Sequence, residues 1–414
     1  MNKFKYFFIL LITGVILVSC NKNDDDDDVK TVPLRDYTEQ YNTDNANIEE
    51  YLNTYHITVV DSPGNQEDQD VAISKITDPA TQPSIMSYLN SASFPKLLTR
   101  NISLNGVAYK MYYLVLREGT GTSPMNTDGV LAAYKGEYMT RVEATTTAPI
   151  VPAHLTTTLF QEIKFPQASL DLYGSVMGWS EIFPQFKTGT STIQADGTVK
   201  YENFGAGVLF IPSGLGYYTG NSRGTVVIPP YSPLIFSFKL YDLERMDHEL
   251  GLVNGVNAYV GDGVFDYQED INGDGYVYDY RNTTLYPNAP VNLDDTDKDG
   301  IPDFIDIDDD GDGYRTIVEI AKPTAEVGGS FGPSRYYPFE AFAIVDDPMT
   351  PNVNESLNSE PKGIPRRPTG ALTKPDDPKD PVESATNPRK YVEEDYTANP
   401  RLRIYLDNTY PIKK

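Results

Sequence analysis

The chain has 414 residues, enough for about two to three domains of ordinary size. It carries 34 Lys and Arg against 59 Asp and Glu, a formal net charge of -25 at pH 7. Clustered cations supply the affinity of proteins for phosphate backbones, so this balance excludes a nucleic-acid partner. The single Cys precludes a disulfide within the chain, and the three His are too scattered to predict a zinc site. The aromatic share of 12% is too high for a wholly disordered acidic chain, so we expect a folded part.

Residues 1–19 are typical of an export signal. A short basic end precedes an apolar run, Tyr6 to Val18, that is too short to span a membrane. Leu17-Val18-Ser19 then leads into Cys20, and the whole stretch resembles a bacterial lipoprotein signal peptide. This resemblance implies cleavage before Cys20 and lipidation of its thiol. An ordinary signal peptide that contains a Cys is the alternative.

Residues 20–35 form a predicted acidic tether. Its five consecutive aspartates, Asp24 to Asp28, repel one another and cannot fold. The run is similar to the acidic stretch of surface-exposed lipoproteins in Bacteroidetes-type bacteria. We therefore expect an outer-membrane lipoprotein, exposed at the surface or facing the periplasm, whose partner at this end is the membrane, reached through the lipid anchor.

Three further regions flank a central domain. Residues 36–105 are expected to be a helical docking region, with a weak helix from Tyr37 to Tyr55 and possible caps at Thr43, Asp44 and Asn45. Residues 246–320 are rich in Asp and Gly. Residues 321–414 are rich in Pro and charge and predict a largely irregular tail, which ends in one more strand at Arg401 to Leu406.

Residues 106–245 predict a mainly β domain, because aromatic and β-branched residues alternate in runs broken by Gly and Pro. Five blocks follow one another in a specific order: Leu114 to Gly121, Ala133 to Gly136, Met177 to Glu181, Phe210 to Tyr217 and Val227 to Phe236. In this order they resemble an FKBP-type peptidyl-prolyl cis-trans isomerase over residues 109–244.

The resemblance implies an α+β fold: an FKBP-like antiparallel half-barrel wrapped on a short helix, with an apolar pocket floored by a Trp. Matched by position, the residues expected to line this pocket are Tyr134, Phe160, Val176, Trp179, Tyr217, Ile228 and Phe236. For any one of them, simple core packing is the alternative.

Such a pocket suits prolyl isomerisation, whose barrier of roughly 20 kcal/mol arises from amide resonance. An apolar cleft can hold the proline ring and remove water from the amide, and the hydroxyl of Tyr217 can hydrogen-bond the substrate carbonyl. No cofactor is needed for this catalysis.

Two departures from the family pattern stand out. Gln161 follows Phe160 where family members usually carry Asp, so the activity is expected to be weaker. Polar insertions at residues 139–158 and 189–205 are expected to form loops or a flap near the pocket.

The Asp-rich segment predicts calcium loops, because Asp recurs at alternate positions with Gly at position 6. The first loop would use Asp295, Asp297, Asp299, the Ile301 carbonyl, Asp303 and Asp306. The second would use Asp308, Asp310, Asp312, the Tyr314 carbonyl and Glu319. A poorer third consists of Asp270, Asn272 and Asp274, with Arg281 at position 12, and would need help from Asp266, Glu269 or Asp279.

These loops resemble thrombospondin type 3 repeats and EF-hand loops. The thrombospondin form is closer, since no long helices flank them. A soluble acidic linker is the alternative. Without metal the carboxylates would repel one another, so we expect structural Ca²⁺ to fold and stiffen the segment.

Together these features favour an FKBP-type prolyl isomerase that assists the folding of envelope or secreted proteins and whose partners are proline-containing protein clients. The alternatives are a non-catalytic surface lipoprotein that binds proline-containing partners in adhesion or assembly, and a structural envelope protein.

The lipid anchor generates the first prediction. Cys20→Ala removes the only thiol that could be acylated, so the protein is expected to leave the membrane fraction for the soluble one. Fractionation of cells that express each form measures this. A Cys20→Ala protein that still sediments with membranes would contradict the anchor.

Overall fold

The computed structural model describes residues 33–346, 353–397 and 400–411. The predicted signal, Cys20 and nearly all of the tether lie outside these residues. The chain from Asp36 onward is one compact unit. Among the described helices, none is both long and apolar enough to cross a membrane.

The described helices and strands follow one another along the chain. In chain order they are α2 (Tyr37–Thr54), β1 (Tyr55–Val59), β2 (Val71–Lys75), β3 (Lys96–Leu104), β4 (Val107–Arg117), β5 (Gly129–Val142), β6 (His154–Ile163), β7 (Leu170–Asp171), α3 (Met177–Ile182), β8 (Thr190–Ile193), β9 (Val199–Glu202), β10 (Gly205–Ile211), β11 (Asn221–Arg223), β12 (Val226–Ile228), β13 (Leu234–Glu244), β14 (Leu250–Val253), β15 (Val256–Tyr259), α4 (Thr316–Glu319) and α5 (Glu393–Thr397). Three 3-10 turns matter below: η2 (Phe183–Gln185), η3 (Ser213–Leu215) and η9 (Ile404–Leu406).

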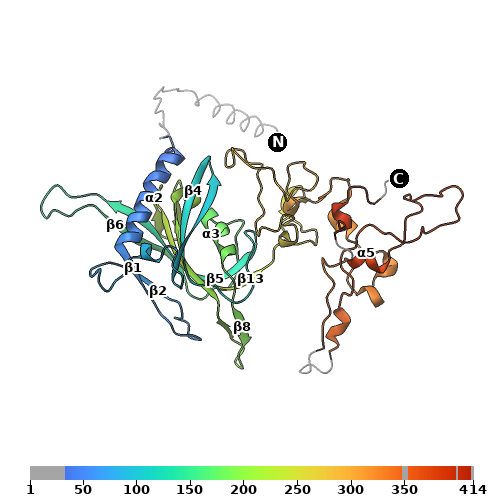
Figure 1. Ribbon diagram of the computed structural model, residues 1–414, viewed down its shortest axis with the longest axis horizontal. Helices are drawn as coiled ribbons and strands as arrows, with labels where there is room; N and C mark the ends of the chain where they lie inside the picture. The colour runs from blue at the N-terminus through green and yellow to red at the C-terminus, as the bar shows by residue number, and fades with distance from the viewer. Residues whose placement is uncertain (1–32, 347–352, 398–399, 412–414) are drawn as a thin grey trace, which may run out of the picture. The chain divides into compact units, whose positions relative to one another are not determined.

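A seven-stranded antiparallel sheet forms the main body (Figure 1). Its strands lie in the order β3-β4-β10-β13-β5-β6, and β7 pairs with β5. Every residue of β10 is buried, as expected for a central strand covered on both faces. The predicted boundary at residue 106 falls inside the hairpin of β3 and β4, so the sheet starts before it.

Two hydrophobic cores cover the two faces of this sheet. Successive β4 side chains alternate between them: Tyr113 joins the core that contains α3, and Leu114 joins the core that contains α2. The predicted α+β half-barrel wrapped on a short helix is therefore confirmed. The sequence did not predict that α2 would close the opposite face.

Helix α2 is present where a helix was expected, but its N-cap was predicted wrongly. The carboxylate of Asp36 accepts hydrogen bonds from the N–H groups of Thr38 and Glu39, at 2.9 and 3.0 Å. The buried Asp44 instead accepts from the backbone N–H (2.8 Å) and the hydroxyl (2.6 Å) of Ser213. A residue with capping chemistry therefore serves a tertiary contact that fixes η3.

Both polar insertions contain paired strands, and in the first of them a loop over residues 143–153 joins the two strands. β5 and β6 stay paired from Tyr134 opposite Ile163 to Val142 opposite His154. β8 and β9 pair across the second insertion. In each hairpin the two strands pair with each other, and this pairing satisfies their backbone N–H and C=O groups although the side chains are polar.

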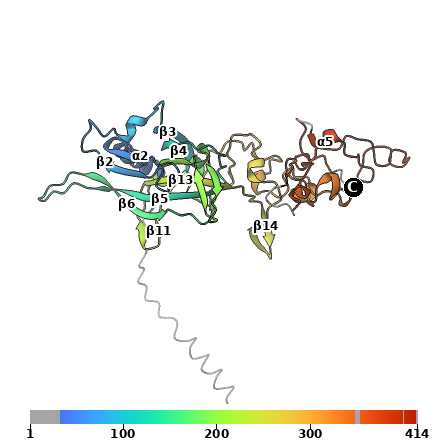
Figure 2. The same ribbon diagram turned by 90° about the horizontal axis from the view of Figure 1, so that it is seen from below.

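The C-terminal region is irregular, as predicted, yet its apolar residues share a buried core with the Asp-rich segment. Buried in it are Val264, Ile320, Tyr337, Ile364, Ile404 and Tyr405. The predicted strand at its end is wrong: Arg403 makes a single bridge to Arg366, and Ile404 begins η9. No longer partner strand is paired with this stretch in the described chain. Figure 2 shows this region with α5, and the hairpin of β14 and β15 projecting before it.

The contact of Asp44 with Ser213 gives the second prediction. Asp44→Ala leaves the buried N–H and hydroxyl of Ser213 without their acceptor, so we expect a loss of about 2–4 kcal/mol in the free energy of unfolding. Denaturant unfolding measures it. Thr43→Ala, an exposed neighbour on α2, is the control and should change stability by about 0.5 kcal/mol or less. Equal stabilities of the two variants would refute the role of Asp44.

Candidate functional site

A cavity of about 590 Å³ opens beside α3. Of the seven predicted pocket residues, five line it: Tyr134, Val176, Trp179, Tyr217 and Phe236. The other two support it from behind. The ring of Phe160 packs edge-on against that of Phe236, with centroids 5.5 Å apart, and Ile228 is fully buried in the adjoining core.

Aromatic rings meet at right angles around Trp179, which α3 carries in its first turn. The ring centroids of Tyr134 and Phe236 lie 5.0 and 5.1 Å from that of Trp179, at interplanar angles of 89° and 82°. Phe183 of η2 stacks beneath the indole at 4.9 Å. Edge-to-face contacts of this kind fix ring orientation, so the pocket has a rigid floor.

Gly136 of β5 makes this ring arrangement possible. It stands opposite Phe236 in the sheet register. A Cβ atom at this position would lie 2.6 Å from the Phe160 ring and 2.7 Å from the Phe236 ring. Because real carbon atoms do not approach so closely, only glycine leaves room for both rings at the wall of the pocket.

Polar groups stand at the rim. The hydroxyl of Tyr217 accepts a hydrogen bond of 2.5 Å from the guanidinium of Arg223. A hydroxyl that accepts from a cation is polarised as a donor, so its proton is well suited to a carbonyl oxygen. Burial raises the pKa of Tyr134, which keeps that phenol protonated. Gln161 also lines the cavity, and none of the described lining residues is Asp or Glu.

The three aspartate loops share one backbone turn. In each, the carboxylate at position 1 accepts the N–H of the glycine at position 6: Asp295 from Gly300 (3.1 Å), Asp308 from Gly313 (2.9 Å) and Asp270 from Gly275 (2.8 Å). These glycines have φ of +98°, +91° and +85°, a region that other residues rarely adopt. The predicted loop geometry is thus present in the fold.

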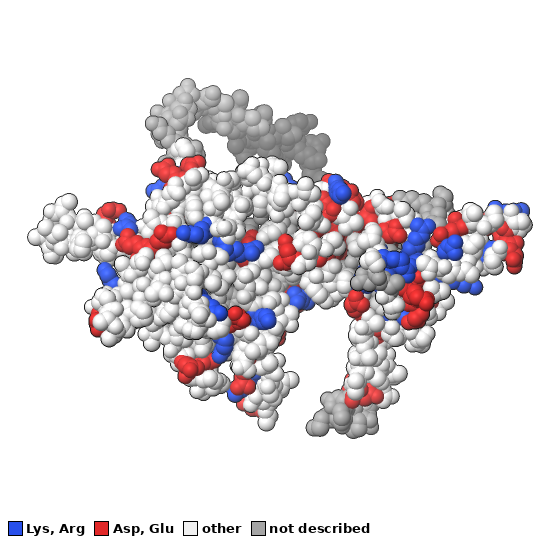
Figure 3. Space-filling view, viewed as in Figure 1, with Lys and Arg blue, Asp and Glu red and all other residues white. Residues whose placement is uncertain are grey.

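The side chains of two loops converge. Carboxylate oxygens of Asp295, Asp297 and Asp299 lie within 4.8 Å of one another, as do those of Asp308, Asp310 and Asp312. The N–H groups of Ile301 and Tyr314 each donate to the carboxylate at position 5, at 2.7 Å. Figure 3 shows acidic side chains gathered over the Asp-rich segment, while the face of the half-barrel seen in this view is mostly uncharged.

Glu319, the residue expected at position 12 of the second loop, is not a member of the converging group but feels the charges of its aspartates. Burial, reinforced by the charges of Asp310 and Asp312, raises its pKa to about 9. Both of its carboxylate oxygens are buried without a hydrogen-bond partner. This donor set consists of oxygen atoms and could hold a calcium ion.

Two other predicted ligands, Asp303 and Asp306, accept hydrogen bonds from residues nearby in the sequence. Asp303 accepts from the N–H and hydroxyl of Thr296, at 2.8 and 2.7 Å, and Asp306 accepts from the N–H groups of Ile307 and Asp308. Neither belongs to the converging group of the first loop. Both carboxylates therefore organise turns rather than joining the cluster.

The third loop gains a residue that the sequence did not indicate. The side-chain amide of Asn272 donates to both oxygens of the buried Asp294, at 3.1 and 3.0 Å. Asp274 accepts the N–H of Tyr276, and Arg281 at position 12 pairs with Asp279. Asp294 follows Asn272 by 22 positions, beyond the range of any loop pattern.

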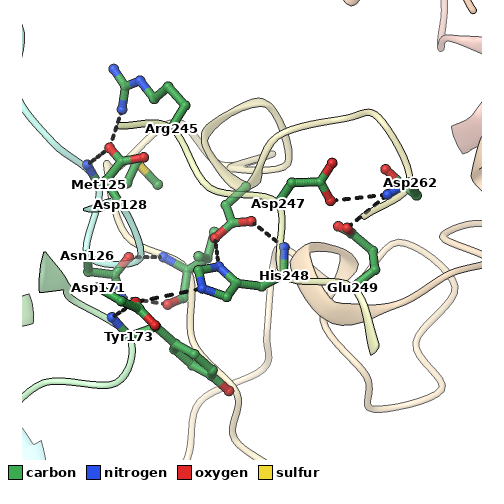
Figure 4. Close-up of polar contacts among 12 residues, drawn as sticks. Met125, Asn126, Asp128, Asp171, Tyr173, Arg245, Asp247, His248, Glu249 and Asp262 are labelled. Atoms are coloured by element: carbon green, nitrogen blue, oxygen red, sulfur yellow. Dashed lines mark hydrogen bonds and ion pairs between the residues drawn. The ribbon is translucent and has the colours of Figure 1, made fainter. Parts of the chain in front are cut away.

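The Asp-rich segment docks on the half-barrel near the pocket. The Tyr276 hydroxyl donates to the carbonyl of Glu181 in α3 (2.9 Å), and Asn126 exchanges two hydrogen bonds with the backbone of Val277. His248 contacts Asp171 of β7 on its other side (Figure 4). Burial lowers the pKa of His248, but its bonds to Asp171 and Asp266 outweigh this and raise it to about 9.

Comparison with known proteins gives one family-model match and several matches to solved structures. A family model described as BamM C-terminal (BamM_C) matches residues 261–352. A peptidyl-prolyl cis-trans isomerase from Pseudomonas syringae pv. tomato has 20% identity and a TM-score of 0.23, over 37% of this chain and 84% of that one. FkpA from Escherichia coli has 26% identity and a TM-score of 0.22, over 33% of this chain and 48% of that one. The N-terminal domain of FKBP42 from Arabidopsis thaliana has 13% identity and a TM-score of 0.23, over 35% and 94%.

The search of curated proteins gives no match. The TM-scores above are low, so these matches do not indicate which residues of this chain are functional. Which residues are functional is inferred from the geometry of the pocket.

The loops give the third prediction. Chelation of calcium should speed amide hydrogen exchange in residues 270–319 because their carboxylates then repel, while β4, β10 and β13 stay protected.

Asp310→Asn should weaken calcium binding at the second loop at least about tenfold, or ~1.4 kcal/mol.

Calorimetric titration of the full chain measures that affinity. Asp376→Asn, an exposed aspartate of the C-terminal region, is the matched control and should leave it unchanged. Identical exchange with and without calcium would exclude the loops as metal sites.

Proposed function

We propose that the chain is an FKBP-type peptidyl-prolyl cis-trans isomerase. The observation that carries this proposal is the pocket itself: an aromatic floor around Trp179, with the polarised hydroxyl of Tyr217 at its rim. Prolyl isomerisation makes and breaks no covalent bond and needs no nucleophile, so a site without carboxylates is adequate for it.

The proposed mechanism uses the groups of the pocket in turn. The rings of Tyr134, Trp179 and Phe236 hold the proline and exclude water from the amide. Removal of water favours the twisted amide, whose carbonyl is less polar than that of the planar form. The Tyr217 proton then stabilises the rotated carbonyl oxygen by a hydrogen bond that Arg223 strengthens. In this mechanism the acceleration comes from the shape of the pocket, the removal of water from the amide and one hydrogen-bond donor.

Gln161 favours a second candidate, a non-catalytic module that binds proline-containing partners. It lines the cavity where the family pattern has a carboxylate, so a charge that could orient the substrate is replaced by a neutral amide. The same pocket would then bind a partner segment without accelerating its rotation.

We also propose a setting for this activity. The lipid on Cys20 would anchor the chain to the outer membrane, and calcium would stiffen the Asp-rich segment that contacts α3 through Tyr276. The clients would be proline-containing segments of envelope or secreted proteins. The contact with α3 supports the view that the segment holds the pocket in place.

The fourth prediction tests the activity directly. The full chain in detergent and saturating calcium should accelerate the cis-trans exchange of a proline peptide, followed by exchange NMR. Tyr217→Phe removes only the hydroxyl and should lower the acceleration at least about tenfold, or ~1.4 kcal/mol, with peptide affinity retained. Trp179→Ala should abolish both acceleration and binding because it removes the floor.

Tyr88→Phe removes a hydroxyl outside the cavity and is the matched control. Peptide binding without acceleration in the unaltered chain would reject the isomerase in favour of the binding module. In that case Gln161→Asp tests whether the missing carboxylate is the cause.

A further inference from the structure

A second group of acidic side chains contains none of the ligands predicted for the first two loops. We call it the buried carboxylate cluster, and its members are Asp247, Glu249, Asp262, Asp266, Glu269 and Asp309. Their oxygens form three overlapping groups, each within 4.8 Å, and Glu269 belongs to two of them. The members come from three separate stretches of chain, so no loop motif brings them together.

Five members of this cluster are removed from water, and four of them have oxygens that lack a hydrogen-bond partner. Glu249, Asp266 and Glu269 are 0% exposed, Asp309 is 1% and Asp262 is 2%. Both oxygens of Glu269, both of Asp309, and one each of Glu249 and Asp262 are buried without a hydrogen-bond partner. Across the described residues, no Lys or Arg forms an ion pair with any of these four.

The remaining oxygens hold the cluster in shape. Asp247 and Glu249 both accept the N–H of Asp262, at 3.1 Å each (Figure 4). The two oxygens of Asp266 are both bonded to His248, one to its N–H and one to its ring, at 3.1 and 2.7 Å. The cluster is therefore organised at its margin by hydrogen bonds, and the oxygens without partners belong to its interior.

An isolated carboxylate in a dry interior costs several kcal/mol unless a cation or a proton balances it. Two oxygens that bind one calcium ion at 2.3–2.6 Å lie up to about 5.2 Å apart, which accommodates the observed groups. Oxygen donors with several negative charges select a hard divalent cation.

We propose that Glu249, Asp262, Glu269 and Asp309 form a buried calcium site that shares no ligand with the first two predicted loops, although Asp309 lies between two ligands of the second. It lies beneath the C-terminal region. Tyr405 of η9 is 0% exposed, and burial together with the charges of Glu269 and Asp309 raises its pKa. Its neighbour Ile404 packs in the same core as Val264, two residues from Asp262. An ion here would fix the C-terminal region to the Asp-rich segment.

The test compares Glu269→Gln, which keeps the size of the side chain and removes its charge, with Asp297→Asn in the first loop. Bound calcium in the full chain is counted by native mass spectrometry, and amide exchange is followed at residues 401–411. Glu269→Gln should lose at least one ion and speed exchange at Ile404 and Tyr405 at least about tenfold. Asp297→Asn should change the first loop and leave those residues protected.

The unaltered chain provides a second readout that does not depend on a variant folding. In saturating calcium, infrared spectra should show the buried carboxyl groups in their ionised form. Native mass spectrometry should show one more tightly held ion than the three loops account for. Protonated carboxyl bands that persist in calcium would overturn the site, as would a Glu269→Gln chain that keeps every ion. Neither result bears on isomerisation, whose failure would leave this site intact.

Discussion

The central sheet can exist only because both of its faces are covered. β10 is buried along its whole length, and β4 sends alternate side chains into opposite cores. One cover is α3, which brings Trp179 to the pocket, and the other is α2. Through Asp44, α2 also fixes η3, the turn that precedes Tyr217. The pocket floor and its hydroxyl are thus positioned from opposite sides of one sheet.

A second constraint is the disposal of negative charge. The half-barrel pairs its buried acids with cations: Glu181 with Arg100 and Asp128 with Arg245. In the Asp-rich segment Arg281 pairs with Asp279, but within the described chain no Lys or Arg pairs with Glu249, Asp262, Glu269 or Asp309, and each of these four has a buried oxygen without a hydrogen-bond partner. Under the proposals above, calcium serves there as the counter-charge that arginine provides in the half-barrel. The difference explains how so acidic a segment could pack against a hydrophobic core.

Much of the fold and part of the site could be predicted from the sequence. The five ordered blocks predicted the half-barrel, and five of the seven expected side chains line the cavity. Phe160 and Ile228 could not be separated from these, because lining and supporting aromatic or aliphatic residues look alike in sequence. The N-cap at Asp36 and the hairpins of the insertions were missed. Local sequence preference allows several caps and several loop conformations, and packing against the rest of the chain selects one of them.

The sequence by itself determined the features that depend on neighbours along the chain. These are the alternation of β4 and the loop turns with Gly at position 6. Only the tertiary structure decided which distant groups meet: Asp44 with Ser213, Asp294 with Asn272, and Glu269 with Asp309. The physical reason is that periodicity and turn chemistry are encoded within a few residues, whereas burial and charge balance are settled by the whole chain.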